Sequence, residues 1–194
     1  QHGDVQNLKY QYVDRPHPGA HEVLVRVKAT ALNHLDVWTL LGSTGLKIPL
    51  PHVLGCDTAG EVVALGKKVK GIPLNRMVII APGLSCGKCS YCMTGWDSLC
   101  ASYKIMGFQV NGGYAEYVTA PAHNIIPVSD RLSAEEWAAV PLVFLTAWHM
   151  LVTRAGLLKG ETVLIHAAGS GVGSAAIQIA KFLQAHIITT VGSD

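Results

Sequence analysis

Four cysteines fall between positions 86 and 100 of this 194-residue chain, in the spacing C-x2-C-x2-C-x7-C. This cluster constrains the fold more than any other feature, because four thiolates so close together can complete a tetrahedral zinc site. A site with four protein ligands has no open position for a substrate, so a zinc ion there is structural. The sequence therefore predicts a zinc lobe over about residues 82–104, with the ligands Cys86, Cys89, Cys92 and Cys100.

Two other uses of these cysteines fit the rest of the sequence less well. Iron–sulfur proteins with this early spacing continue with x3-C-P, whereas here the last gap is seven residues and no proline follows Cys100. Disulfides form in an oxidising compartment, but residues 1–10 are polar and lack the apolar segment of a signal peptide. We therefore expect a cytoplasmic protein whose cysteines are thiols or metal ligands.

Composition and charge argue against several classes of protein. Apolar residues make up 49% of the chain and charged residues 14%, so there is enough apolar surface to drive folding. The net charge of +2 argues against a nucleic-acid partner, since phosphate recognition needs a concentrated basic face. The longest apolar stretch, residues 138–152, is shorter than the roughly 20 residues that span a bilayer. We expect neither a nucleic-acid nor a membrane partner.

The first part of the chain has the pattern of an all-β domain. Residues 22–29 alternate apolar and polar side chains, the period-2 pattern of a half-buried strand, and residues 60–65, 76–81 and 114–119 also indicate strands. Turns that contain glycine or proline separate these runs. The sequence therefore predicts an antiparallel barrel or sandwich over about the first 125 residues.

Beyond this region the pattern changes to helices and strands in alternation. Ser133 and Glu136 form a capping box at the start of one helix, and Pro141 fits the first turn of the next. Residues 161–166 and 186–191 are predicted as strands buried on both faces, with a helix over residues 174–184 between them. Strand, glycine loop, helix and strand make one βαβ unit. The fold class is therefore mixed, an all-β domain followed by the first part of an α/β domain.

A doubly wound nucleotide-binding fold needs about six parallel strands, and two are visible, so we expect the chain to end inside its second domain. The glycine loop opens a helix, as dinucleotide-binding loops do, and glycines let the backbone approach a pyrophosphate. The candidate residues are Ala168, Gly169, Ser170, Gly171, Val172 and Gly173. Ser174 stands where the usual spacing has its third glycine, so a turn without a ligand remains the alternative.

The end of the second strand bears on the choice of cofactor. NAD-binding folds usually have an acidic residue there that accepts the ribose 2′-hydroxyl. Residues 189–193 contain no carboxylate, and Ser193 can donate to a 2′-phosphate. The sequence therefore favours NADP(H) over NAD(H), although Asp194, one position further on, keeps NAD(H) open.

The order of these parts resembles the medium-chain dehydrogenase/reductase superfamily, which includes zinc alcohol dehydrogenases and quinone oxidoreductases. The resemblance covers essentially the whole chain, and its motifs are PHVLG at 51–55, GEVV at 60–63, the cysteine lobe, GGYAEYV at 112–118 and AAGSGVG at 167–173. It implies a GroES-like barrel domain over residues 1–128 and the first part of a Rossmann domain over residues 129–194. It also implies a homo-oligomer for the full-length protein.

The chain departs from the zinc alcohol dehydrogenases at their catalytic metal. These enzymes hold a second zinc with a cysteine in C-x-[ST]-D, a histidine in G-H-E and a cysteine four residues before a Thr-Gly/Ala pair. The corresponding residues here are Asn33, Cys56 and Leu142, so two of three ligands are lost. Cys56 is then either a small buried apolar residue or part of an improvised zinc set with Asp57 and His34 or His52.

Three further residues match family positions and also have ordinary structural explanations. Asp36 matches an acid that supports the active site, or it caps a helix. His34 matches a residue that often approaches the cofactor pyrophosphate or the substrate, or it is a surface residue. Thr146 matches a residue near the nicotinamide, or it hydrogen-bonds its own helix backbone.

These observations predict an NADP(H)-dependent oxidoreductase that delivers hydride to a quinone or an α,β-unsaturated carbonyl, with one structural zinc and no catalytic zinc. The candidate catalytic residues are Asn33, His34, Asp36, Cys56 and Asp57. Two alternatives remain: a zinc-dependent alcohol dehydrogenase with non-standard ligands, and a non-catalytic, zinc-stabilised nucleotide-binding domain. The expected partner is a small carbonyl, quinone or alcohol substrate.

Overall fold

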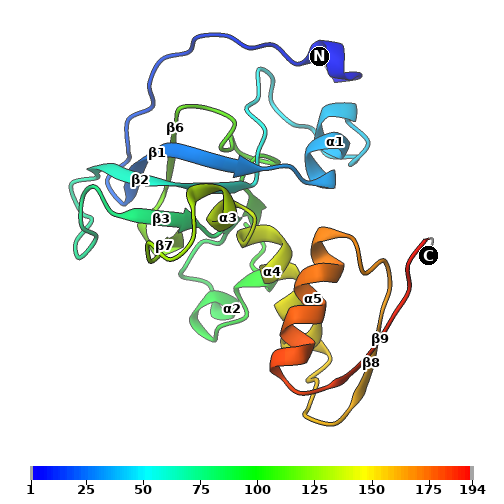
Figure 1. Cartoon of the computed structure of the whole chain (residues 1–194). Coiled ribbons are helices and arrows are strands. Elements are labelled where there is room, and N and C mark those ends of the chain that lie inside the picture. Colours follow the sequence, from blue (N-terminus) through cyan, green and yellow to red (C-terminus); the bar gives the residue numbers. More distant parts are fainter. Residues whose placement is uncertain (1, 193–194) are drawn as a thin grey trace. The chain divides into compact units, whose positions relative to one another are not determined.

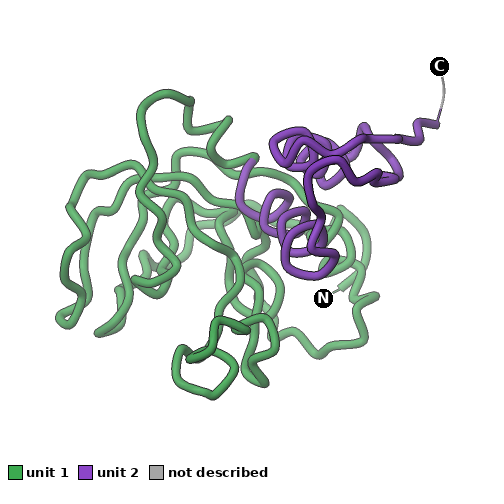
Figure 2. Tube along the Cα trace, turned by 90° about the horizontal axis from the view of Figure 1, so that it is seen from below, with its two compact units in different colours: residues 1–139 green, residues 140–194 purple. Residues whose placement is uncertain are grey.

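The computed structural model describes residues 2–192, and the chain divides into two compact units, residues 1–139 and residues 140–194 (Figure 1, Figure 2). Each unit has a hydrophobic core of its own. Ser193 and Asp194, on which the expected cofactor preference depends, lie outside the described residues.

The framework of the first unit is a five-stranded sheet in which every pair of neighbouring strands is antiparallel (Figure 1). The strands are β1 (Glu22–Ala31), β2 (Asp57–Leu65), β3 (Met77–Ile80), β6 (Tyr117–Pro121) and β7 (Ile125–Pro127). Their order is β6-β1-β2-β3-β7. The prediction of an antiparallel β region at the start of the chain is confirmed.

The prediction of a strand over residues 114–119 is wrong at its start. The strand β6 begins only at Tyr117, because the residues before it pair with a different segment. The backbone N–H groups of Gly112, Gly113 and Tyr114 donate to carbonyl groups of Val53, Gly55 and Leu54 at 2.7–2.9 Å.

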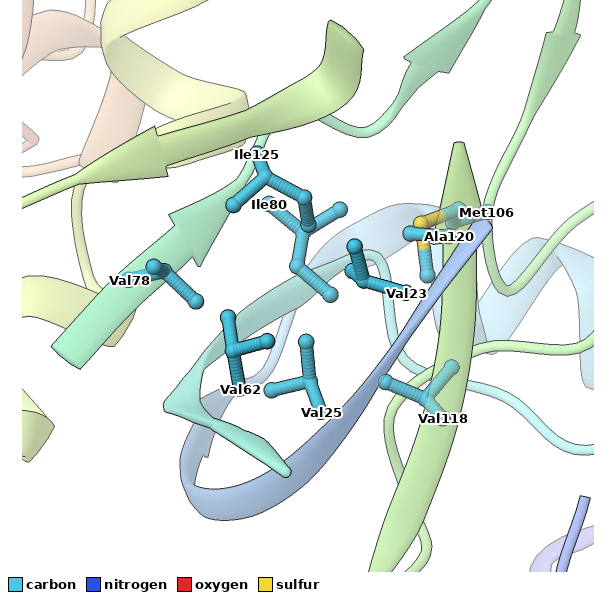
Figure 3. Packing of buried hydrophobic residues seen from close by; sticks show 9 residues of the cluster. All are labelled: Val23, Val25, Val62, Val78, Ile80, Met106, Val118, Ala120 and Ile125. Carbon is cyan, nitrogen blue, oxygen red and sulfur yellow. The ribbon is translucent and has the colours of Figure 1, made fainter. Parts of the chain in front are cut away.

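Alternate residues of the strands fill the core of the first unit. Val23 and Val25 of β1 are fully buried, and Leu24 between them is only 2% exposed, so both faces of β1 are covered at this point. Burying each such side chain contributes roughly 1.5–3 kcal/mol before the entropy of ordering is counted. The core cluster consists of Val23, Val25, Val62, Val78, Ile80, Met106, Val118, Ala120 and Ile125 (Figure 3).

Shorter elements complete the first unit. The helix α1 spans His34–Leu41 and α3 spans Ala134–Ala138. The predicted capping box of α3 is confirmed, since Ser133 Oγ accepts from Glu136 N at 3.2 Å and Glu136 Oε2 accepts from Ser133 N at 2.8 Å. The remaining elements are η1 (Val5–Asn7), β4 (Gly83–Leu84), α2 (Ser90–Met93), η2 (Asp97–Leu99), β5 (Lys104–Ile105) and η3 (Ala122–Asn124).

The second unit contains one parallel strand pair. Its elements are α4 (Pro141–Trp148), the π-helical turn η4 (His149–Arg154), β8 (Thr162–Ile165), α5 (Gly171–Phe182) and β9 (His186–Thr189). The strands β8 and β9 pair in parallel with α5 between them in sequence, which is the arrangement of a βαβ unit. No helix within residues 2–192 has the length and apolar character needed to cross a bilayer.

The expectation that β8 and β9 are buried on both faces is wrong for the described residues. Leu164 is 55% exposed and Ile188 is 56% exposed, whereas Ile165 is buried. Ile165, Val163 and Ile187 belong to the core cluster formed with α4 and α5, so these helices cover one face of the strand pair.

Candidate functional site

The four cysteines of the lobe come together at the spacing of a metal site. Their Sγ atoms all lie within 4.8 Å of one another, with Cys89 and Cys92 at 3.4 Å and Cys86 and Cys92 at 3.9 Å. A tetrahedral zinc with Zn–S bonds of about 2.3 Å requires its sulfurs to be roughly 3.8 Å apart. The cluster is therefore consistent with a structural zinc.

Local structure sets up this arrangement. The strands β4 and β5 pair next to the cysteine cluster, α2 follows directly after Cys89 and carries Cys92, and η2 ends at Leu99, directly before Cys100. Hydrogen bonds from the backbone of Lys88 and Cys89 lower the pKa of the Cys86 thiol to about 6. In the same cluster the pKa of the Cys89 thiol is raised to about 11, because a backbone hydrogen bond that lowers it is outweighed by side-chain hydrogen bonds with Cys92, Cys86 and Cys100 and by burial. Cys86 is therefore the cysteine whose environment favours the thiolate, which is the form that binds zinc.

The first unit also contains a buried polar cluster formed by Asn33, Asp36, Cys56, Asp57 and Tyr114. Asp36, Cys56 and Asp57 are 5%, 0% and 1% exposed. Asn33 is the residue before α1, and its Nδ2 donates to Asp57 Oδ2 at 2.8 Å. Four of the five candidate catalytic residues therefore lie in one region, although they come from two segments of the chain.

The carboxylate of Asp36 is the centre of this polar cluster. Its Oδ2 accepts from Asn33 N at 2.8 Å and from the hydroxyl of Tyr114 at 2.7 Å, and its Oδ1 accepts from Gly55 N at 3.2 Å. The bond to Asn33 caps α1, so the helix-cap explanation of Asp36 is borne out by the structure. The same carboxylate also links α1 to the segment that contains Cys56.

Cys56 lies beside two carboxylates and is protonated at neutral pH. Burial raises the pKa of its thiol to about 12, and the charges of Asp36 and Asp57 raise it in the same direction. A zinc ion needs the thiolate as its ligand. The environment of Cys56 therefore favours the neutral thiol, which behaves as a small apolar residue.

The two histidines considered for an improvised metal set make other contacts. His34 is exposed at the start of α1, with its ring centroid 5.7 Å from that of Trp38. His52 Nε2 hydrogen-bonds to the carbonyl of Gly107 at 3.1 Å. Within residues 2–192 the four-cysteine cluster is the group of three or more His, Cys, Asp or Glu side chains close enough to hold a metal. The structure does not bring Cys56, Asp57 and a histidine together in that way.

In the second unit the glycine loop leads into α5. The helix begins at Gly171, three residues earlier than the sequence indicates, and Ser170 caps it by accepting from Gly173 N at 3.0 Å. A Cβ on Gly173 would overlap the carbonyl of Ala167, so glycine is required where the loop passes close to the helix. The loop therefore leads into the first turn of a 12-residue helix, and the N-terminus of such a helix suits an anion.

The loop is tied to the end of β9 by a residue that sequence reasoning missed. Thr190 Oγ1 accepts from Ala167 N at 3.1 Å, and the carbonyl of Thr190 accepts from Ala168 N at 3.0 Å. Ala167 has a left-handed backbone (φ +55°), which is unusual for a residue other than glycine.

Thr146, the residue predicted to lie near the nicotinamide, lies partly exposed on α4, the helix that packs against α5.

Tyr114 is the other residue that was missed, because only its place in the GGYAEYV motif marked it. It lies 78 positions after Asp36, so no local pattern pairs the two residues. Thr190 is similarly 23 positions from Ala167. Residues that contact the candidate residues from such distances become visible only in the folded chain.

Comparison with known proteins agrees with this geometry. The model of the alcohol dehydrogenase GroES-like domain family matches residues 19–130. The chain therefore belongs to the medium-chain dehydrogenase/reductase family of zinc alcohol dehydrogenases, and it contains the GroES-like part.

Three relatives illustrate the similarity. An NAD-dependent alcohol dehydrogenase of Sulfolobus acidocaldarius is 35% identical over 95% of this chain and 55% of its own length. A crystal structure of an NAD-dependent alcohol dehydrogenase is 51% identical, with a TM-score of 0.96 over 100% of this chain and 56% of that one. The cobalt- and zinc-bound thermostable alcohol dehydrogenase of Pyrobaculum aerophilum is 36% identical, with a TM-score of 0.89 over 97% of this chain and 56% of that one. The chain thus spans about half the length of these relatives.

Proposed function

We propose that this chain is part of an NAD(P)H-dependent reductase of quinones or α,β-unsaturated carbonyls that contains a structural zinc and works without a catalytic zinc. The observation that carries the proposal is the hydrogen bond from Asn33 Nδ2 to Asp57 Oδ2 at 2.8 Å. It fixes a neutral carboxamide at the position where zinc alcohol dehydrogenases have a cysteine ligand. A donor of hydrogen bonds therefore stands where the family has a metal ligand.

The other family positions support the same proposal. Cys56 is a thiol with a pKa of about 12 rather than a thiolate, and Leu142 has no ligand atom in its side chain. Without a metal to polarise a carbonyl or to lower the pKa of an alcohol, oxidation of simple alcohols is slow. A quinone or an enone accepts hydride more readily, because its conjugated system delocalises the charge that develops.

Asn33 has the chemistry to assist such a reaction. A carboxamide nitrogen has two N–H bonds, and Asp57 accepts one of them. The negative charge of Asp57 strengthens this bond and holds the amide in one orientation. We assign the second N–H to the carbonyl oxygen of the substrate, where charge develops during reduction. His34, exposed one residue further on, is the other candidate for contact with substrate or cofactor.

The glycine loop of the second unit fits the pyrophosphate of a dinucleotide. Residues 168–173 precede and open α5, and Ser170 caps its first turn by accepting from Gly173 N. When bound, a nicotinamide would supply the hydride, and the reduced enone would carry that hydride on its β-carbon and a proton from solvent on its α-carbon. The residues of the loop are assigned to bind and orient the dinucleotide. Thr146 is assigned to its nicotinamide end through the family resemblance.

We retain NADP(H) as the preferred cofactor within this proposal. Thr190, Val191 and Gly192 follow β9 without a carboxylate, so nothing in this described segment repels a 2′-phosphate. Ser193 is the residue assigned to donate to that phosphate. The names of the relatives from Sulfolobus acidocaldarius and of the crystal structure favour NAD(H) instead. The ratio of kcat/KM for NADPH and NADH decides between the two cofactors.

The domain boundaries, the compartment and the oligomeric state belong to the same proposal. We assign residues 1–128 to the GroES-like domain and residues 129–194 to the start of a Rossmann domain. The family match over residues 19–130 supports the first assignment, and the parallel pair β8 and β9 supports the second. The whole protein is proposed to be a cytoplasmic homo-oligomer that acts on small molecules.

The decisive experiment uses the whole natural protein that contains this sequence. We expect one zinc per chain by elemental analysis, and oxidation of NADPH with quinones or enones faster than reduction of NAD(P)⁺ with simple alcohols. Asn33→Leu keeps the size of the side chain, removes the donor, and is expected to lower kcat by roughly 100-fold. Gln11→Leu, which removes a carboxamide from an exposed position, is the matched control.

The alternatives predict different results. Two zinc ions per chain, brisk alcohol oxidation and loss of one zinc together with activity on dialysis against a chelator support a zinc-dependent alcohol dehydrogenase. No turnover of a broad panel of acceptors, with the cofactor bound, supports a non-catalytic nucleotide-binding protein.

A further inference from the structure

Tyr114 contacts the polar cluster in two separable ways. Its backbone N–H donates to the carbonyl of Leu54 at 2.9 Å, and its ring covers Gly55, where a Cβ would overlap the ring. Its hydroxyl donates to Asp36 Oδ2 at 2.7 Å and lies 3.3 Å from the carbonyl oxygen of Ala31. A phenylalanine preserves the ring packing and the backbone bond and removes only the hydroxyl.

The hydroxyl acts on a carboxylate whose other partners are backbone amides. Asp36 also accepts from Asn33 N and Gly55 N, so one carboxylate fixes the start of α1 against the segment before Cys56. Hydrogen bonds to an ionised acceptor are stronger and more directional than neutral ones. The rotamer of Asp36 therefore determines where the backbone of Asn33 lies, and the backbone position in turn determines where the Asn33 side chain begins.

The phenol remains a donor under ordinary conditions. Burial raises the pKa of Tyr114, and the charge of Asp36 raises it further. The proton therefore stays on the phenol and is shared with Asp36. Tyr114 is not itself a member of the candidate catalytic set, since its hydroxyl is occupied by Asp36 and by Ala31.

We propose that Tyr114 is a positioning residue, which acts through Asp36 to hold Asn33 where its carboxamide meets the substrate. The contacts exist whatever the reaction is, but the consequence for catalysis rests on the proposed function of Asn33. The inference therefore has one test that needs no activity and one that does.

The first test measures amide hydrogen exchange in the whole natural protein. In Tyr114→Phe we expect the amides of Asn33 and Gly55 to exchange roughly ten-fold faster, because Asp36 loses the partner that fixes its rotamer. Amides within the β1–β2 ladder should keep their wild-type rates. Tyr12→Phe is the matched control, because Tyr12 is 92% exposed. Unchanged exchange at Asn33 and Gly55, or equal acceleration throughout the sheet, overturns the proposal.

The second test measures turnover with whichever substrate the wild-type protein uses. We expect Tyr114→Phe to lower kcat roughly ten-fold with the KM for the dinucleotide unchanged, the loss of about one hydrogen bond to a charged group. Asp36→Ala removes the acceptor of the Tyr114 hydroxyl, so if Tyr114 acts through Asp36, then Tyr114→Phe added to Asp36→Ala lowers kcat no further. Additive losses, or a lower unfolding temperature with unchanged kcat, overturn the proposal. If the wild type oxidises alcohols rather than reducing enones, the proposed function fails. The kcat values of the wild type and the Tyr114→Phe variant can still be compared with an alcohol as substrate.

Discussion

Replacing Asp36 by asparagine tests how strongly the buried polar cluster stabilises the first unit. The carboxylate accepts three hydrogen bonds, from Asn33 N, Gly55 N and the hydroxyl of Tyr114. An asparagine has one acceptor oxygen, which best replaces Oδ2 and keeps the partners Asn33 and Tyr114. Its NH2 group then faces the N–H of Gly55, and that buried donor is left without an acceptor.

The size of the effect follows from these bonds. An orphaned buried donor costs about 1–3 kcal/mol, and two bonds that change from charged to neutral acceptors lose about 1 kcal/mol each. The amide is also less costly to bury than a carboxylate, which offsets part of the loss. We expect Asp36→Asn to lower the free energy of unfolding by about 3 kcal/mol.

Urea unfolding of the zinc-loaded protein at pH 7, followed by far-UV circular dichroism, measures this change. Asp14→Asn is the control, because Asp14 is exposed and a surface substitution changes stability by less than about 0.5 kcal/mol. A loss for Asp36→Asn no larger than that of the control would refute the reasoning, since it would mean that Asp36 does not hold three donors in solution.

Three further outcomes are expected. Cys100→Ser should lose the zinc, whereas Cys56→Ala should retain it, as measured by elemental analysis of zinc per chain. The folded-state pKa of Cys56 is raised from 9.0 to about 12, so the unfolded chain releases this proton first and stability falls as pH rises from about 9 to about 12. Cys56→Ala should therefore lose less stability than the wild type over that interval, as measured by urea unfolding at each pH. If both proteins lost the same free energy of unfolding between about pH 9 and about pH 12, the raised pKa of Cys56 would be contradicted. Gly55→Ala should destabilise by more than about 2 kcal/mol, because Gly55 has φ +98° and faces the ring of Tyr114. Urea unfolding at pH 7 measures this loss, and Gly71→Ala, at φ +78° with open space around it, isolates the backbone cost in the same assay.

Features with a short-range physical cause could be read from the sequence. The spacing of the cysteines sets how closely their sulfurs can approach, and the four Sγ atoms do lie within 4.8 Å of one another. The Ser133–Glu136 capping box needs only three residues of separation and is present. The period-2 alternation of residues 22–29 depends on strand geometry alone, and the valines it marks are in the core.

Features that depend on distant contacts were decided by the tertiary structure. The start of β6 shifted because residues 112–114 pair with residues 53–55, a competition that no local pattern records. The apolar residues of β8 indicated burial, but whether one face or two is covered depends on which elements pack there. The partners of Asp36 lie 19 and 78 positions away, and Thr190 lies 23 positions from Ala167. The residue types of the candidate site could therefore be predicted from the sequence. The tertiary structure decided which of them share a hydrogen bond and hence which pKa values shift, because folding excluded water and brought together segments that are far apart in the chain.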